Sequence, residues 1–343
     1  MNNLKISIII PFYNRIELLI KTIASVKNSS SNNWELILVN DHTTENIKPI
    51  KDLAYNNPKI RVINVPIGQK GGQVARNIGA KNANYELLMF LDSDDLLLPW
   101  TIENRLQFIQ QNFTAEMWVF VGAEFNENTK EITRLRTIYK CKEPLKEFLS
   151  FQSVWQTSCA IWDKNAFNAI GGWNEKTKSW QDGEIYSRFL FLNGNFLWSD
   201  NQTPDVLIRF HTKDNRISNK RGLENRINLY QTHQELLQLL DGEIKKLFER
   251  NIIHSLFDTV ESLPKDELKD YVNWIQTLSI SKRKKHLIKC YSKWYQYLNY
   301  NNFTYRILYQ IRKVGIFDKR QNFWSVRPKI DKNSEKLIKT HIF

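Results

Sequence analysis

The sequence predicts an α/β fold in which a doubly wound, mostly parallel, Rossmann-like sheet precedes a helical C-terminal region. In the first half, β-branched runs alternate with segments whose apolar residues recur at helical spacing. Polar and acidic residues directly follow two of these runs, at residues 40–41 and 92–95. Because strands that alternate with helices are joined by parallel crossovers, we expect these residues at one edge of the sheet, where such sheets bind ligands.

The first strand is predicted at residues 5–10, a β-branched run that ends at Pro11 and is typical of a buried strand. Residues 16–26 follow with apolar residues at helical spacing, which predicts a helix with one buried face. Further strands are predicted at residues 34–39, 61–65, 86–91, 118–121 and 206–210. Further helices are predicted at residues 73–82, 99–111, 164–169 and 184–193.

Residues 212–222 are polar and poor in apolar residues, which predicts a domain boundary. Beyond this stretch the apolar spacing is helical throughout. We therefore expect an α/β domain over residues 1–218 and a helical region over residues 219–343.

The chain of 343 residues is 42% hydrophobic and 25% charged, as in folded globular proteins. No apolar run approaches the roughly 20 residues of a membrane-spanning helix. The N-terminus lacks the pattern of a secretory signal, so we expect a cytoplasmic protein. The three cysteines are too few and too widely spaced for a metal knuckle or a disulfide framework, which predicts inert thiols.

The net charge of +13 comes entirely from residues 281–343, which hold 16 Lys and Arg against 3 Asp and Glu. Aromatic residues are interleaved with these basic residues. The pattern fits peripheral binding to the inner face of an anionic membrane. It also fits a helical cap with aromatic residues packed inward, whereas nucleic acid is the least favoured partner and none is expected.

Asp92, Asp94 and Asp95 directly follow the strand predicted at residues 86–91. Carboxylates this close repel one another unless a cation or hydrogen-bond donors satisfy them. Mg²⁺ and similar hard cations bind through one or two carboxylates together with substrate phosphates. The cluster therefore predicts either a metal-bridged diphosphate or a solvated turn that caps the next helix.

Other candidate residues have two interpretations each. The loop 68–72 lacks the residue pattern of a P-loop or a dinucleotide-binding loop, which disfavours kinases, ATPases and dehydrogenases. Arg76, in the following helix, is either a diphosphate ligand or a surface arginine. Asp182 is either a general base or a helix cap, and His211 is either a ligand or a structural residue.

Seven segments in order together resemble the family 2 glycosyltransferases, over roughly residues 4–218. They are Ser-Ile-Ile-Ile-Pro-Phe-Tyr-Asn-Arg (7–15), Leu-Ile-Leu-Val-Asn-Asp (36–41), Ala-Arg-Asn-Ile-Gly (75–79), Phe-Leu-Asp-Ser-Asp-Asp (90–95), Gly-Gly-Trp-Asn-Glu (171–175), Gln-Asp-Gly-Glu (181–184) and Ile-Arg-Phe-His (208–211).

The resemblance implies a GT-A fold and an inverting enzyme that uses a nucleotide-diphosphate sugar, UDP-sugar above all, with Mn²⁺ or Mg²⁺. It implies Asp182 as the catalytic base and an acceptor that is a glycan or a lipid-linked sugar in surface polysaccharide synthesis. Donor-binding residues would be Pro11, Tyr13, Asp41, Arg76, Asp92 and Ser93. Metal ligands would be Asp94, Asp95 and His211, and acceptor-binding residues Gly172 and Trp173.

Two positions depart from the family pattern. Asn40 stands where many relatives have Asp, which affects the expected contacts to the nucleotide base. Gly183 follows Asp182 where an aromatic residue is common, so we expect an unusually shaped acceptor side. The alternatives to a glycosyltransferase are a nucleotidyltransferase and a non-catalytic module that binds glycans or nucleic acid.

Overall fold

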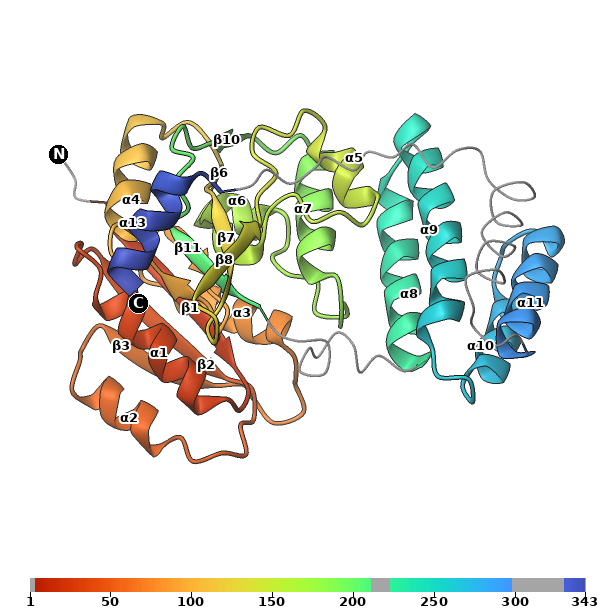
Figure 1. Ribbon diagram of the computed structural model, residues 1–343, viewed down its shortest axis with the longest axis horizontal. Coiled ribbons are helices and arrows are strands. Elements are labelled where there is room, and N and C mark those ends of the chain that lie inside the picture. The colour runs from red at the N-terminus through yellow and green to blue at the C-terminus, as the bar shows by residue number, and fades with distance from the viewer. Residues whose placement is uncertain (1–3, 211–222, 298–329, 343) are drawn as a thin grey trace. The chain divides into compact units, whose positions relative to one another are not determined.

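The computed structural model describes residues 4–210, 223–297 and 330–342 of the chain (Figure 1). The described residues form two compact units. Residues 4–148, 152–210 and 330–342 make the first unit, and residues 149–151 and 223–297 make the second.

The first unit is organised around a seven-stranded sheet. Its strands, in spatial order, are β10 (Phe196–Trp198), β6 (Met117–Val119), β9 (Ala160–Asp163), β4 (Leu87–Phe90), β1 (Ile6–Phe12), β2 (Trp34–Asn40) and β3 (Ile60–Asn64). Only β9 runs antiparallel to its neighbours in this sheet. The predicted α/β class with a mostly parallel sheet is therefore confirmed.

Every residue of β1 and β2 is buried, which explains their nearly continuous apolar sequence. The two strands pair in parallel, with Ile8 opposite Leu36. The helices of this unit that accompany the sheet are α1 (Ile16–Lys27), α2 (Lys48–Tyr55), α3 (Gly72–Lys81), α4 (Thr101–Gln111), α5 (Pro144–Leu149), α6 (Lys164–Ala169) and α7 (Gln181–Phe191). Helix α3 packs on β1 and β2 and so begins close to the carboxyl ends of these strands.

A second sheet of four strands completes the first unit. Its order is β5 (Leu96–Leu97), β11 (Val206–Arg209), β7 (Gly122–Asn126) and β8 (Glu131–Leu135). Helix α13 (Lys332–Ile342) also belongs here, because Ile338 is fully buried in a cluster with Leu98 and Val121. The helical C-terminal region predicted for residues 219–343 is thus divided between the two units, and apolar burial of α13 is the reason.

The second unit consists of helices α8 (Leu223–Leu239), α9 (Gly242–Ser262), α10 (Leu268–Thr277) and α11 (Lys282–Tyr297). Tyr291 is buried in its core, with its ring 5.7 Å from that of Phe257. Residues 298–329, which carry much of the predicted basic and aromatic surface, lie outside the described residues. No helix in the described ranges has the length and apolarity needed to cross a bilayer.

Candidate active site

The residues that follow β1, β2 and β4 lie at one edge of the large sheet, because these three strands run parallel. Tyr13 follows β1, Asp41 follows β2 and Asp92 follows β4. These strand ends are where the sequence places the donor site, so the predicted convergence of β1, β2 and β4 is present in the structure.

The side of this edge near β2 is shaped by Asp41. Both carboxylate oxygens of Asp41 accept the backbone N–H of Gly71, at 3.0 and 3.1 Å. Tyr13 is 46% exposed, and the Lys70 ammonium lies 5.6 Å from the centre of its ring. Pro11, by contrast, is buried within β1. Tyr13 therefore offers an open aromatic face, while Asp41 holds the loop that precedes α3.

The three carboxylates of the acidic turn have different surroundings. The Asp92 side chain is 40% exposed and that of Asp94 is 19% exposed. Asp95 is buried, where it accepts hydrogen bonds from the Ser158 hydroxyl at 2.8 Å and from the Arg209 backbone N–H at 3.2 Å. Burial, with help from the neighbouring charges of Asp92 and Asp94, raises the pKa of Asp95 well above its usual value.

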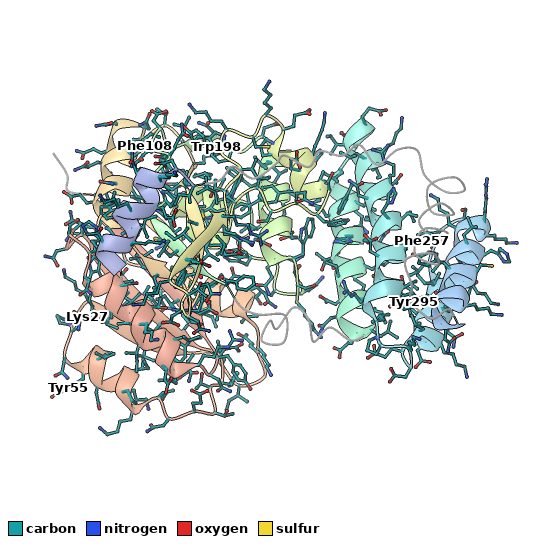
Figure 2. All side chains as sticks on the ribbon, in the orientation of Figure 1. Lys27, Tyr55, Phe108, Trp198, Phe257 and Tyr295 are labelled. Atoms are coloured by element: carbon teal, nitrogen blue, oxygen red, sulfur yellow. The ribbon has the colours of Figure 1, made fainter. Side chains whose placement is uncertain are left out.

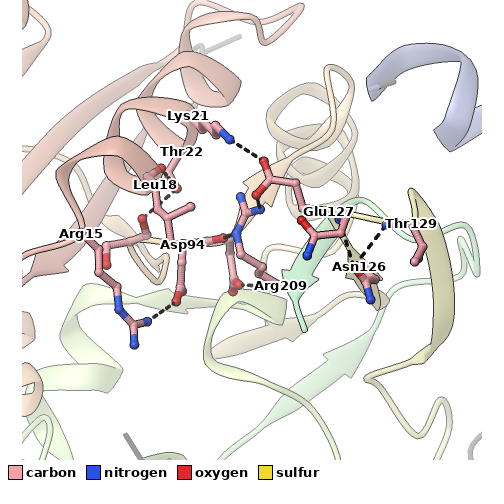
Figure 3. Close-up of polar contacts among 12 residues, drawn as sticks. Arg15, Leu18, Lys21, Thr22, Asp94, Asn126, Glu127, Thr129 and Arg209 are labelled. Carbon is pink, nitrogen blue, oxygen red and sulfur yellow. Dashed lines mark hydrogen bonds and ion pairs between the residues drawn. The ribbon is translucent and has the colours of Figure 1, made fainter. Parts of the chain in front are cut away.

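Asp94 and Arg209 connect the acidic turn to elements on either side (Figure 3). Arg15 donates to the Asp94 carboxylate at 3.1 Å, and Arg209 Nε donates to the Asp94 backbone carbonyl at 2.8 Å. The Arg209 guanidinium also pairs with Glu127, which in turn accepts from Lys21 of α1 at 2.6 Å. The turn is therefore held by cations that the sequence alone does not assign to it.

Arg76 on α3 joins the acidic turn to α7. Its Nη2 donates to Asp92 Oδ1 at 2.6 Å, and its Nη1 donates to Gln181 Oε1 at 2.8 Å. The guanidinium carbon lies 4.9 Å from the ring centre of Trp173, and the side chain is 10% exposed. Arg76 is thus a buried clamp between two segments more than 80 residues apart in sequence.

Asp182 lies in the first turn of α7, one residue after Gln181, and accepts the N–H of Gly183 at 2.9 Å. The helix begins three residues earlier than predicted, so Asp182 is part of it. Burial raises the pKa of Asp182, the nearby charge of Asp92 raises it further, and Arg136 and Arg76 lower it. The charge of Asp92 therefore influences the ionisation of Asp182.

Trp180 explains the unusual glycine after Asp182. Trp180 adopts a left-handed conformation, with φ of 59°, directly before α7. A Cβ atom at Gly183 would lie 2.0 Å from the Trp180 indole, which leaves room only for glycine. The aromatic group at this place comes from residue 180 of the sequence, and not from residue 183.

The 171–175 loop is fixed to the helices on both sides. Asn77 of α3 accepts the Trp173 N–H at 2.9 Å and donates to the Trp173 carbonyl at 2.8 Å. Arg188 of α7 donates to the Gly172 carbonyl at 2.7 Å. Trp173 itself is 2% exposed, with its ring against Phe90. Trp173 is an expected acceptor-binding residue, but this burial leaves no face of its ring open to a sugar.

Arg136 is a further residue near Asp182 that sequence reasoning missed. Its side chain is 18% exposed and donates to Glu124 at 3.1 Å, while its Nε is buried without a hydrogen-bond partner. Arg134 pairs with the same Glu124 but is 45% exposed. No sequence pattern separates these two arginines, because the difference lies in how much of each side chain the fold buries.

The described residues include no group of three or more His, Cys, Asp and Glu side chains arranged around a metal position. Asp92 and Asp94 are each paired with an arginine, and Asp95 is satisfied by protein donors. Ser93 is half-buried, and its carbonyl accepts the Thr22 hydroxyl at 3.0 Å. His211, the third predicted metal ligand, lies outside the described residues.

Comparison with known proteins covers the part of this site that comes from the N-terminal half of the chain. Residues 7–168 match the family model described as Glycosyl transferase family 2. An uncharacterized glycosyltransferase of Rickettsia conorii is 37% identical over 112 residues, which are 33% of this chain and 18% of that protein. The poly(ribitol-phosphate) beta-N-acetylglucosaminyltransferase TarP of Staphylococcus aureus is 33% identical over 110 residues, 32% of this chain and 34% of that protein.

The fold is that of a solved glycosyltransferase. The structure of Staphylococcus aureus TarS 1–349 in complex with UDP superposes with a TM-score of 0.59 at 14% identity, covering 96% of this chain and 99% of that chain. The same fragment has been solved in complex with UDP-GlcNAc. The aligned part of this chain spans less than a fifth of the Rickettsia relative. The predicted GT-A fold is confirmed.

Proposed function

We propose that this chain, whose residues 7–168 belong to family 2 of the glycosyltransferases, transfers a sugar with inversion from a nucleotide-diphosphate sugar to an acceptor hydroxyl. The observation that carries the proposal is the Arg76 clamp, which bonds Asp92 of the acidic turn and Gln181, the neighbour of Asp182. Arg76 therefore connects two parts of the site. One is the partly exposed edge with its arginines, which suits a diphosphate, and the other is the Asp182 carboxylate, which suits a general base.

The donor that we propose is a UDP-sugar, and UDP-GlcNAc is the first to test. The TarS fragment was solved with UDP and with UDP-GlcNAc, and TarP is named an N-acetylglucosaminyltransferase. In this chain Tyr13 would stack on the base, since nearly half of it is exposed. Asp41 would hydrogen-bond the base in place of, or alongside, the Gly71 N–H that it accepts here.

In the proposed reaction Asp182 accepts the proton of the acceptor hydroxyl. The acceptor oxygen then forms a bond to the anomeric carbon from the face opposite the diphosphate. The bond from that carbon to the diphosphate oxygen breaks, and the nucleotide diphosphate leaves with the electron pair, which inverts the configuration. Arg76 and Arg15 are the described cations beside the acidic turn that would stabilise the developing negative charge.

Mn²⁺ or Mg²⁺ is the cofactor that we propose. Asp92 and Asp94 fit such an ion, because a divalent cation commonly takes one or two carboxylates and completes its shell with phosphate oxygens and water. Asp95 does not fit, because its carboxylate is buried on Ser158 and Arg209. When bound, the ion would supply positive charge next to the diphosphate. Asp94→Asn should reduce the thermal stabilisation by Mn²⁺ with UDP; an unchanged Mn²⁺ titration would remove Asp94 from the ligand set.

The acceptor that we propose is a glycan or a lipid-linked sugar in surface polysaccharide synthesis, since TarP is named for transfer to poly(ribitol-phosphate). Trp180, half-buried beside Asp182, is the aromatic residue that we assign to acceptor stacking instead of Trp173. Helix α11 carries six Lys and Arg and no acidic residue, which supports peripheral contact with anionic lipid. Reversing Lys282 and Arg283 to Glu should weaken binding to phosphatidylserine vesicles; unchanged binding would reject that contact.

Asp182→Asn tests the proposal. The variant should bind UDP-sugar as before and lose at least about 100-fold in turnover, the lower range for a general base. Donor binding is measured by thermal shift and turnover by UDP release in the presence of acceptor. Asp52→Asn is the matched control, because the Asp52 side chain is 56% exposed on α2 and lies outside the proposed site. Near-normal turnover of Asp182→Asn would reject Asp182 as the base.

A further inference from the structure

A cavity of the first unit lies between α4 and the segment that links β10 to β11. Its volume is about 330 Å³, near the lower end of the roughly 300–1,000 Å³ of small-ligand sites. Helix α4 lines it with Asn104, Gln107, Phe108 and Gln111, and the linking segment with Ser199, Asp200, Asn201 and Thr203. None of the residues assigned to the proposed transfer reaction lines this cavity.

The α4 wall is a stripe of amides around one aromatic ring. Asn104, Gln107, Phe108 and Gln111 follow the spacing that places residues on one face of a helix. The side chains of Gln107 and Gln111 are exposed, and neither makes a hydrogen bond to a described protein group. Phe108, labelled in Figure 2, is half-buried. Its ring is edge-on to that of Phe120, with 5.9 Å between the ring centres. This face of α4 therefore presents unused donors and acceptors beside a partly open ring.

The opposite wall is held in shape by its own side chains. The Ser199 hydroxyl accepts the Asn201 N–H at 3.2 Å, and Asn201 Oδ1 accepts the Thr203 N–H at 2.9 Å. Asp200 is 90% exposed at the rim. These turns preorganise the segment and leave the Asn201 amide nitrogen and the Thr203 hydroxyl for a ligand.

Charge restricts the class of ligand. The residues lining the cavity include neither lysine nor arginine. Asp205, the other carboxylate there, is buried and paired with Arg105 through two bonds of 2.6 and 2.7 Å. Phosphates and nucleotides, which need cationic or N–H-rich sites, are therefore disfavoured. Side-chain amides that both donate and accept suit neighbouring hydroxyl groups, and a partly open ring suits the apolar face of a sugar.

We propose that the cavity between α4 and residues 199–205 binds an uncharged sugar residue of a glycan. Such a site goes beyond sugar transfer and does not depend on it, because it is built from residues outside the candidate active site. On an enzyme that acts on glycans, it would hold the polymer at a second place and raise its local concentration at the reacting end.

The test uses the full chain and a panel of neutral sugars: the methyl glycosides of glucose, galactose and N-acetylglucosamine, with maltotriose and chitotriose. Binding is measured by saturation-transfer NMR and by titration. The double variant Gln107→Ala/Gln111→Ala should bind the best of these sugars at least about 10-fold more weakly, because two hydrogen-bonding amides are lost. Gln110→Ala is the matched control, since Gln110 is an exposed glutamine of the same helix that does not line the cavity.

Three results would overturn the proposal. One is the absence of binding by every sugar in the panel. Another is an equal loss in the Gln110→Ala control, which would locate the effect in the helix and not in the cavity. The third is displacement of the sugar by UDP or inorganic phosphate at similar concentration, which would assign the binding to the cationic edge near Arg76. A circular dichroism spectrum of the double variant that equals that of the wild type checks that α4 is intact.

Discussion

Arg76→Lys tests the clamp of the candidate active site most directly. Each terminal nitrogen of the guanidinium has a different partner: Nη2 donates to Asp92 at 2.6 Å and Nη1 to Gln181 at 2.8 Å. A lysine keeps the positive charge but has a single ammonium group, which cannot point toward both partners as a planar fork does. The substitution therefore removes the connection between the two segments and leaves the net charge unchanged.

The magnitude follows from the contacts that are lost. The hydrogen bond from the charged guanidinium to Gln181 contributes about 1.5–3 kcal/mol. The cation–π contact with buried Trp173, at 4.9 Å, contributes about 0.5–2 kcal/mol, of which lysine retains a part. A loss of about 2–4 kcal/mol corresponds to a decrease of roughly 30- to 900-fold in kcat/KM. The salt bridge is left out of this sum because lysine can keep it and because Asp92 is 40% exposed.

The assay is UDP release from a UDP-sugar at subsaturating donor. Arg61→Lys is the matched control, since Arg61 also bonds a carboxylate and a second acceptor, Glu35 at 2.7 Å and the Asn82 carbonyl at 2.7 Å, away from the acidic turn. We expect the control to keep turnover within about twofold, as for changes outside a site. Equal kcat/KM in Arg76→Lys and wild type would refute the clamp.

Three further predictions follow from buried groups. Asp205→Asn should cost about 3–5 kcal/mol of unfolding free energy in denaturant titrations, because it leaves its buried arginine partner without a counter-ion. Burial is the main reason that the pKa of Asp182 lies above the ordinary value of 3.8. Because a base acts when deprotonated, turnover should increase as the pH rises through this raised pKa. Arg136 lowers the pKa of Asp182, so Arg136→Gln should move the rise in turnover to higher pH. Gly79→Ala should destabilise the chain by about 1–3 kcal/mol in thermal unfolding, since the new methyl group would lie 2.3 Å from Ile9.

Each of these predictions has an outcome that contradicts it. Asp52→Asn, in a surface pair with Lys48, should cost less than about 0.5 kcal/mol, and an equal cost in Asp205→Asn would contradict the buried-pair argument. Arg134→Gln removes the exposed partner of Glu124 and should leave the dependence of turnover on pH unchanged. An equal shift in Arg134→Gln and Arg136→Gln would mean that this pH dependence does not report the pKa of Asp182. A Gly79→Ala melting temperature equal to wild type would mean that α3 moves freely away from β1.

Sequence patterns predicted the parallel part of the fold well because its strands are buried on both faces. The apolar runs around Ile8, Leu36 and Met89 leave few other structures open to those residues. Helix 164–169 was predicted at its observed bounds, where the Asp163 carboxylate accepts the Ala166 N–H. Strong burial and helix capping both depend on local residues, so each can be recognised in the sequence, as an apolar run or as a capping residue.

The β7–β8 hairpin and β9 were not predicted, for a physical reason. In β8 only Ile132 and Leu135 are buried, so the alternation of apolar and polar residues is short and irregular. The antiparallel β9 follows a 3₁₀ helix, Thr157–Cys159, and pairs with strands that lie far away in the sequence. Arg136 directly follows β8, so missing the hairpin also meant missing a cation that lowers the pKa of the proposed base.

The acidic turn shows where residue type alone stops being informative. Asp92, Asp94 and Asp95 are chemically identical, and the sequence assigns all three to one diphosphate and its metal. In the structure the Asp95 carboxylate accepts hydrogen bonds from Ser158 and from the backbone of β11, whereas Asp92 and Asp94 are partly exposed and pair with arginines. The Asp95 carboxylate already accepts protein hydrogen bonds, so it holds the turn against β11. The carboxylates of Asp92 and Asp94 are partly exposed, and only they can replace an arginine partner by a cation that also binds phosphate. The division of roles therefore arises from the donors that the fold brings to each oxygen, and Asp95→Asn should lower stability more than it alters the Mn²⁺ titration, the reverse of Asp94→Asn.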